Sequence, residues 1–88
     1  MIDHKFKITY PFGLHARPAT MLVSRANSFQ TEMMITFDDK KANLKSIMGV
    51  LSLSVPQNKV FSISFKGSDE EEAYYAISRV IAEINELI

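Results

Sequence analysis

The chain has 88 residues, a length that suits one domain with a single compact core over residues 1–88 and excludes a second domain within it. Its 47% hydrophobic and 23% charged residues are typical of a globular protein, and the absence of cysteine excludes disulfides, thiolate metal sites and cysteine nucleophiles. The net charge is zero, yet residues 1–67 carry nine Lys or Arg against four Asp or Glu, so this part favours an anionic ligand or partner.

The sequence also predicts the compartment. No apolar run approaches the roughly 18 residues that a membrane helix needs. Residues 1–6 lack the apolar core of a signal peptide. Together with the absence of cysteine, these features predict a cytoplasmic protein without membrane insertion.

The first part of the chain predicts a strand followed by a helix. Apolar and polar residues alternate over residues 5–10, which is the period of a half-buried strand, and residues 11–13 end it. From Ala16 onward, apolar residues recur at helical spacing, so we expect a helix that begins at about His15, with Pro18 tolerated in its first turn.

A hairpin and a short helix are expected next. Residues 33–37 alternate again, the Asp pair at 38–39 predicts a tight turn, and residues 41–44 form a weak return strand. Ser46 is suited to be the N-cap of a short helix over residues 47–53.

The last part predicts a strand over residues 60–65 and a helix capped by Ser68 or Asp69, with acidic residues in its first turn. The buried stripe of this helix comprises Ala73, Ile77, Val80, Ile81 and Ile84. The order βαββαβα predicts an α+β open-faced two-layer sandwich, in which three helices cover one face of a four-stranded antiparallel sheet.

Chemistry is concentrated around His15. The sequence places its imidazole at the start of a helix, where the amides of Ala16 and Arg17 lack intrahelical partners. The Arg17 guanidinium in the same turn suits phosphate oxygens, so a phosphorylated His15 could be held there. The alternative is that His15 is a capping or half-buried loop histidine and Arg17 a solvated surface charge. No metal site or nucleotide-binding loop is expected, and hence no cofactor.

Ser46 has two compatible interpretations. As an N-cap it satisfies an amide of the short helix. As a phosphoacceptor it would place negative charge at a helix N-terminus, with Lys45 adjacent. The neighbouring apolar side chains cannot all point inward, so we expect a partner surface if they cluster. Its expected residues are Thr20, Met21, Ile47, Met48 and Leu51.

Residues 13–20 (GLHARPAT) and 43–50 (NLKSIMGV) are similar to the two signatures of the HPr family, the histidine-containing phosphocarriers of the bacterial sugar phosphotransferase system. The resemblance covers essentially the whole chain. It implies that His15 accepts a phosphoryl group on Nδ1 from enzyme I and passes it to sugar-specific IIA domains. It further implies that Ser46 is phosphorylated by an HPr kinase/phosphorylase, after which the protein binds a catabolite-control transcription regulator. We expect the protein to be a monomer.

The sequence departs from the family pattern at two places. Phe12 stands where relatives often have a small polar residue beside the histidine. Any hydrogen bond from that side chain is missing here, so we expect a difference in partner choice or transfer rate. Ser54 replaces a frequent glycine, which affects local loop geometry.

Two alternatives stay open. A regulatory branch of the family acts only through the serine and lacks the histidine, and His15 argues against that branch. The element order is also that of an RNA-recognition module, but residues 41–44 lack the aromatics that stack bases, so we expect no nucleic acid as partner.

Overall fold

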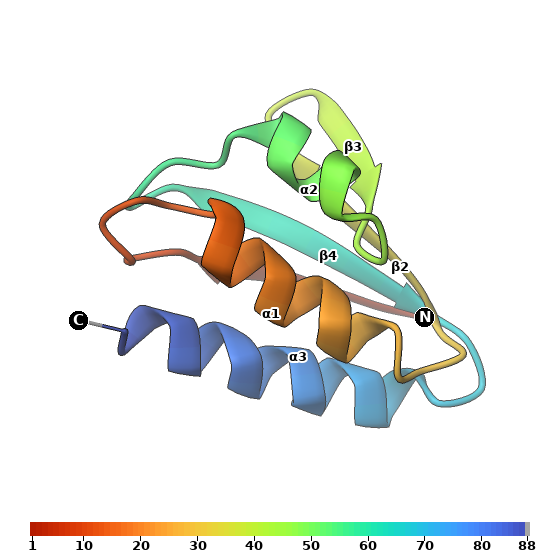
Figure 1. Ribbon diagram of the computed structural model, residues 1–88. Coiled ribbons are helices and arrows are strands. Elements are labelled where there is room, and N and C mark those ends of the chain that lie inside the picture. Colours follow the sequence, from red (N-terminus) through yellow and green to blue (C-terminus); the bar gives the residue numbers. More distant parts are fainter. Residues whose placement is uncertain (88) are drawn as a thin grey trace.

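The computed structural model of the protein describes residues 1–87. Over these residues it has strands β1 (Ile2–Lys7), β2 (Glu32–Phe37), β3 (Lys40–Asn43) and β4 (Val60–Lys66), and helices α1 (Ala16–Ala26), α2 (Ile47–Leu53) and α3 (Glu70–Asn85). The strands form one antiparallel sheet in the order β1-β4-β2-β3, and the helices lie over one of its faces (Figure 1). The predicted open-faced α+β sandwich is confirmed.

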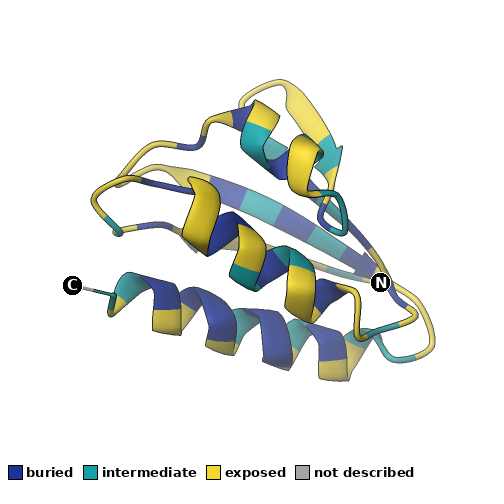
Figure 2. Cartoon of the chain, in the orientation of Figure 1, coloured by how far each residue is buried: buried dark blue, intermediate teal, exposed yellow. Residues whose placement is uncertain are grey.

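The central strand β4 shows how the two faces of the sheet differ. Phe61, Ile63 and Phe65 are buried under the helices, whereas the intervening Ser62 and Ser64 lie on the other face and are half-buried (Figure 2). Because successive side chains of a strand point to opposite faces, this alternation orients the whole sheet. The hydrophobic core therefore lies between the sheet and the helices.

This arrangement bears on the RNA-recognition alternative. Stacking of bases requires aromatic side chains on the open face of the sheet. Phe61 and Phe65 are 2% and 0% exposed beneath the helices, and β3 has no aromatic residue. The structure thus lacks, within residues 1–87, the aromatic platform which that module uses on its central strands.

The first strand differs from the prediction, because β1 begins at Ile2 and ends at Lys7 rather than at residue 10. Ile8 is buried and still pairs with the chain, donating to the Lys59 carbonyl at 3.2 Å. The next amide, that of Thr9, donates instead to the Asn85 side chain at 2.8 Å. The end of α3 therefore replaces the sheet as the hydrogen-bond partner, which terminates the strand.

The hairpin forms as expected, with a small shift. The turn at residues 38–39 joins β2 to β3, and Asp38 adopts a φ of +54°, a conformation that Asp tolerates better than most residues. The return strand begins one residue early, at Lys40, and Leu44 lies just beyond it. Leu44 is nevertheless buried, and its amide donates to the Met33 carbonyl at 2.9 Å.

Helix α3 buries the five stripe residues that the sequence predicted. Asp69 occupies the N-cap position, but its carboxylate does not cap the helix. It accepts hydrogen bonds from the amides of Gln30 and Thr31, both at 3.0 Å, and from the Thr31 hydroxyl. Asp69 thus joins the start of α3 to the loop before β2. No helix within residues 1–87 is both long and apolar enough to cross a membrane.

Candidate functional site

His15 occupies the N-cap position of α1 with an extended backbone, φ −92° and ψ −160°. Its carbonyl accepts the first helical hydrogen bond, from the amide of Ala19 at 2.9 Å. The imidazole is exposed and makes no capping hydrogen bond with the helix. The side chain of His15 therefore neither caps the helix nor is half-buried, and its ring is accessible from solvent.

The loop before His15 is fixed by two hydrogen bonds. The Gly13 amide donates to the Tyr10 carbonyl at 2.9 Å, and the Leu14 amide donates to the Val55 carbonyl at the same distance. Gly13 has a φ of +65°, and a Cβ atom there would lie 2.2 Å from the Val55 oxygen. A glycine is required at this position. The side chain of Leu14 is 2% exposed and anchors the loop in the core.

The first turn of α1 can receive an anion. Ala16 and Arg17 are the first helical residues, so their amides have no partner within the helix, and Pro18 has no amide hydrogen to satisfy. No acidic residue lies in this turn, and the Arg17 side chain is exposed. Within residues 1–87 the one ion pair joins the N-terminal ammonium to Glu70, so Arg17 has no carboxylate partner among the described residues.

Ser46 is the N-cap of α2, as the sequence predicted. Its hydroxyl oxygen accepts a hydrogen bond from the Gly49 amide at 3.1 Å. The ammonium of the adjacent Lys45 donates to the Phe29 carbonyl at 2.7 Å, beyond the end of α1. The charge of Lys45 is therefore engaged with the loop after α1.

The structure places His15 and Ser46 at opposite ends of a pair of adjacent helices. At one end, the Asn27 side chain donates to the Lys45 carbonyl at 3.2 Å, next to Ser46. At the other end, His15 and Leu51 line the same hollow. The two helices thus run antiparallel (Figure 1). Because α1 has 11 residues at about 1.5 Å per residue, it separates the two candidate phosphorylation sites by its own length.

The expected partner surface is partly exposed. Met48 is 75% and Ile47 is 36% exposed, and Thr20 is exposed on α1. Met21 and Leu51 are half-buried and pack against the core. These residues come from α1 and α2, the two helices that carry His15 and Ser46.

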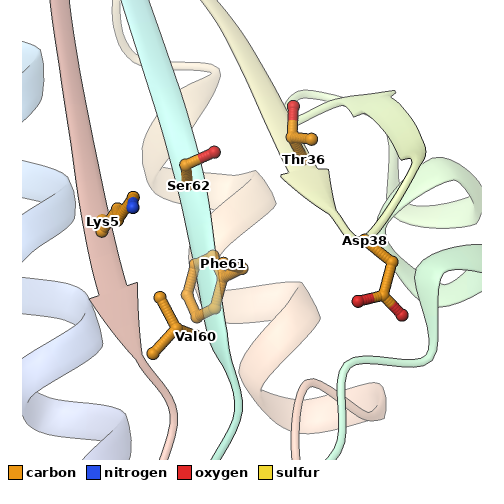
Figure 3. Close-up of a pocket in the computed structure, with 6 residues that line it drawn as sticks. All are labelled: Lys5, Thr36, Asp38, Val60, Phe61 and Ser62. Atoms are coloured by element: carbon orange, nitrogen blue, oxygen red, sulfur yellow. The ribbon is translucent and has the colours of Figure 1, made fainter.

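Two surface hollows lie on opposite sides of the sheet. The first, of about 210 Å³, contains His15 and is lined by Phe12, Leu14, His15, Leu51, Ser54, Val55 and Pro56. The second, of about 230 Å³, lies on the open face and is lined by Lys5, Thr36, Asp38, Val60, Phe61 and Ser62 (Figure 3). Only the first contains a residue that the sequence singled out for chemistry.

The family resemblance had already placed Phe12 beside His15, whereas Leu14 and Val55, which also line the hollow, had no predicted role in the site. Phe12 lines the hollow with His15 and is 71% exposed. The available signal was a large apolar side chain in the turn directly before the histidine. That turn places Phe12 and His15 on the lining of the same hollow.

The sequence of the chain matches that of a known protein family. Residues 2–83 match the family described as "PTS HPr component phosphorylation site". The chain belongs to the HPr family. It is 37% identical to the phosphocarrier protein HPr of Lysinibacillus sphaericus over 84 residues, and the matched residues cover 96% of each chain. HPr proteins are phosphocarriers of the phosphotransferase system, and the open-faced sandwich of this chain is their fold.

Solved structures of HPr relatives have the same fold. That of HPr-C-His from Thermoanaerobacter tengcongensis has a TM-score of 0.94 at 40% identity and covers 100% of this chain and 99% of its own. The Bacillus subtilis catabolite repression protein Crh, described as a dimer with a swapping domain, has a TM-score of 0.74 at 36% identity over 94% of this chain and 95% of its own. The HPr fold thus also serves a regulatory relative.

Proposed function

We propose that this HPr-family chain carries a phosphoryl group on His15, accepts it from enzyme I and passes it to sugar-specific IIA domains. The proposal rests on one observation. The imidazole of His15 is exposed at the N-terminus of α1 and makes no capping hydrogen bond, and Arg17 lies in the same turn. A phosphoryl group on this ring would meet the free amides of Ala16 and Arg17 and the positive end of the helix dipole.

The transfer requires a neutral ring nitrogen and a donor in line with it. By resemblance to the family, Nδ1 attacks the phosphorus of the donor, so that one bond to phosphorus forms as the donor's bond breaks. The reverse process delivers the group to the acceptor. Arg17 provides bidentate contacts to the phosphoryl oxygens. No nucleotide or metal is needed within this chain for that step.

The proposal is tested by incubating the protein with enzyme I and phosphoenolpyruvate and measuring its intact mass before and after acid treatment. We expect a gain of one phosphoryl group that acid removes, because phosphohistidine is acid-labile. His15→Ala should take up none. An acid-stable gain, or an acid-labile gain in His15→Ala, would show that His15 is not the acceptor.

Arg17 is tested separately. Arg17→Ala should slow the transfer while leaving the thermal unfolding curve unchanged, because the side chain is exposed and has no ion pair within residues 1–87. The matched control is Arg79→Ala, which removes a positive charge from the exposed side of α3. Equal slowing in both variants would assign the effect to net charge rather than to Arg17.

We propose that Ser46 is the regulatory site, phosphorylated by an HPr kinase/phosphorylase and, in that state, bound by a catabolite-control transcription regulator. Ser46 lies at the far end of α1 and α2 from His15, so its phosphate would act through the partner surface that both helices share. Roughly two added negative charges beside Ile47 and Met48 would repel an acidic partner. The fold itself need not change.

A second candidate function is that of a regulatory paralogue acting mainly through Ser46. The similarity to Crh favours it. The mass experiment separates the two functions, because a purely regulatory protein would gain phosphate from the kinase and ATP on Ser46 but none from enzyme I. In either case we propose that the protein is cytoplasmic and monomeric. Light scattering of the purified protein would test the monomeric state.

A further inference from the structure

Phe12 is an exposed aromatic residue that contributes nothing to the core. Its side chain is 71% exposed, and its one aromatic neighbour within residues 1–87 is Tyr10, whose ring lies edge-on at 5.8 Å between centroids. Exposure of so large an apolar side chain is unfavourable in water, at about 25 cal/mol for each Å². A partner that covered Phe12 would remove this cost.

The backbone of Phe12 is held in place by hydrogen bonds on its C-terminal side. The hydrogen bond from Gly13 to Tyr10 closes a turn around it, and the hydrogen bond from Leu14 to Val55 fastens this turn to the loop after α2. The backbone that carries the ring is therefore fixed at the edge of the hollow that contains His15, and binding needs to order only the Phe12 side chain.

The hollow that Phe12 lines is mainly apolar. Leu14 and Val55, which are 2% and 1% exposed, line it together with Leu51 and Pro56. His15 is the only titratable residue among those that line it. At about 210 Å³ it has room for one aliphatic side chain. His15 and Ser54 are the polar side chains of its lining, and the other five are apolar.

The charges around the hollow indicate the charge of the protein that would bind there. Helices α1 and α2 contain no Asp or Glu, whereas α1 carries two exposed basic residues, Arg17 and Arg25. A protein that approaches this face is favoured if it is acidic. Any protein that exchanges a phosphoryl group with His15 must also cover the hollow, because the imidazole forms part of its lining.

We propose that Phe12 is a specificity-determining residue, which together with Leu51 and Pro56 receives a protruding aliphatic side chain of the acidic protein that exchanges the phosphoryl group with His15. This inference rests on the proposed function. It identifies the chemistry of the partner: an aliphatic side chain surrounded by carboxylates. It also assigns a role to the position where the sequence departs from its relatives.

The test measures phosphoryl transfer from enzyme I at varied concentrations of wild type, Phe12→Ser and Phe12→Leu. Phe12→Ser should raise KM about tenfold with kcat changed less than about twofold, because the lost contact serves docking rather than chemistry. Phe12→Leu should keep most of the affinity. The matched control is Tyr75→Ser, which removes an exposed aromatic side chain, 67% exposed, from α3 and should leave KM unchanged.

The outcomes separate this inference from the proposed function. An unchanged or lowered KM in Phe12→Ser, or an equal rise in Tyr75→Ser, overturns the inference while transfer by the wild type still supports the phosphocarrier function. A wild-type chain that accepts no phosphoryl group overturns both. Thermal unfolding curves of the three variants should coincide with that of the wild type, since both side chains are exposed.

Discussion

At the scale of single residues, Gly13 determines where His15 lies. Gly13→Ala would place an L-residue at a φ of +65° and a methyl group 2.2 Å from the Val55 oxygen, where the Leu14 amide now donates. We expect the free energy of unfolding to fall by more than about 2 kcal/mol, from left-handed strain together with the steric clash. Urea denaturation measures this change, and transfer to His15 should slow with it.

Gly49→Ala is the informative comparison for Gly13→Ala. Gly49 lies within α2, and an added Cβ there would meet side-chain atoms of Ala42 and Ser46 at 3.2 Å or more. The cost should stay within about 1 kcal/mol, since alanine favours the helix by a similar amount. If both variants lost equal stability, the argument from the φ of Gly13 would be wrong.

Ser54 is strained in the opposite sense, because a serine occupies a conformation that suits glycine. It is the C-cap of α2 with φ +51° and ψ +47°. Relief of left-handed strain, less the greater chain entropy of glycine, should make Ser54→Gly more stable by about 0.5–1 kcal/mol. Differential scanning calorimetry should show a Tm a few degrees higher. Ser52→Gly, inside the same helix, should lower Tm instead, and a rise there would contradict this account.

At the scale of elements, the start of α2 connects stability with regulation. Ser46→Ala removes the acceptor for the Gly49 amide, so we expect a loss of about 1 kcal/mol in the free energy of unfolding. Ser46→Asp keeps an acceptor at the N-cap and should retain the stability. It should nevertheless transfer phosphate more slowly at low salt, and the defect should shrink as salt is added.

Circular dichroism beside the transfer assay decides the Ser46 prediction. If Ser46→Asp is slow only because it is partly unfolded, or transfers at the wild-type rate in low salt, the electrostatic account fails. Ser46→Ala provides the control for loss of the cap alone. Its transfer rate at low salt should equal that of the wild type.

Element boundaries show what periodicity can and cannot predict. The stripe of α3 and the alternation of β4 were predictable because burial follows a helical or strand period along one segment. The end of β1 at Lys7 was not, because Asn85 from the far end of the chain takes over the Thr9 amide and the Lys7 carbonyl. Such a contact leaves no local pattern in the sequence.

At the scale of the whole molecule, the same distinction applies to the candidate site. His15, Arg17 and Ser46 could be identified from their local motifs. The helix start at His15 was predictable from the apolar period and Pro18, and the one at Ser46 from capping rules. The placement of His15 and Ser46 at opposite ends of an antiparallel helix pair, and the presence of Phe12 and Leu51 on the lining of one hollow, depend on contacts between distant segments. Only the folded chain reveals them.

Two carboxylates tie the start of α3 to other parts of the molecule, and they predict how stability depends on pH. Hydrogen bonds from the Thr31 hydroxyl and the Gln30 amide hold the pKa of Asp69 below its ordinary value. The N-terminal ammonium, followed by the Gly67 amide, lowers the pKa of Glu70 in the same way. Both groups bind a proton less readily folded than unfolded, so they stabilise the fold above their unfolded pKa values, about 3.9 and 4.3.

This stabilisation is lost as the pH falls through the folded pKa values, so the Tm of the wild type should drop on acidification below about pH 4. Asp69→Asn removes the carboxylate, so its Tm should be lower at neutral pH and fall less steeply in acid. Thermal unfolding followed from neutral pH to about pH 2.5 measures both effects. Glu72→Gln, which changes an exposed carboxylate in the first turn of the same helix, is the control and should retain the acid dependence of the wild type. An Asp69→Asn variant with an unchanged acid slope would show that the bonds of Asp69 to Gln30 and Thr31 do not couple folding to protonation.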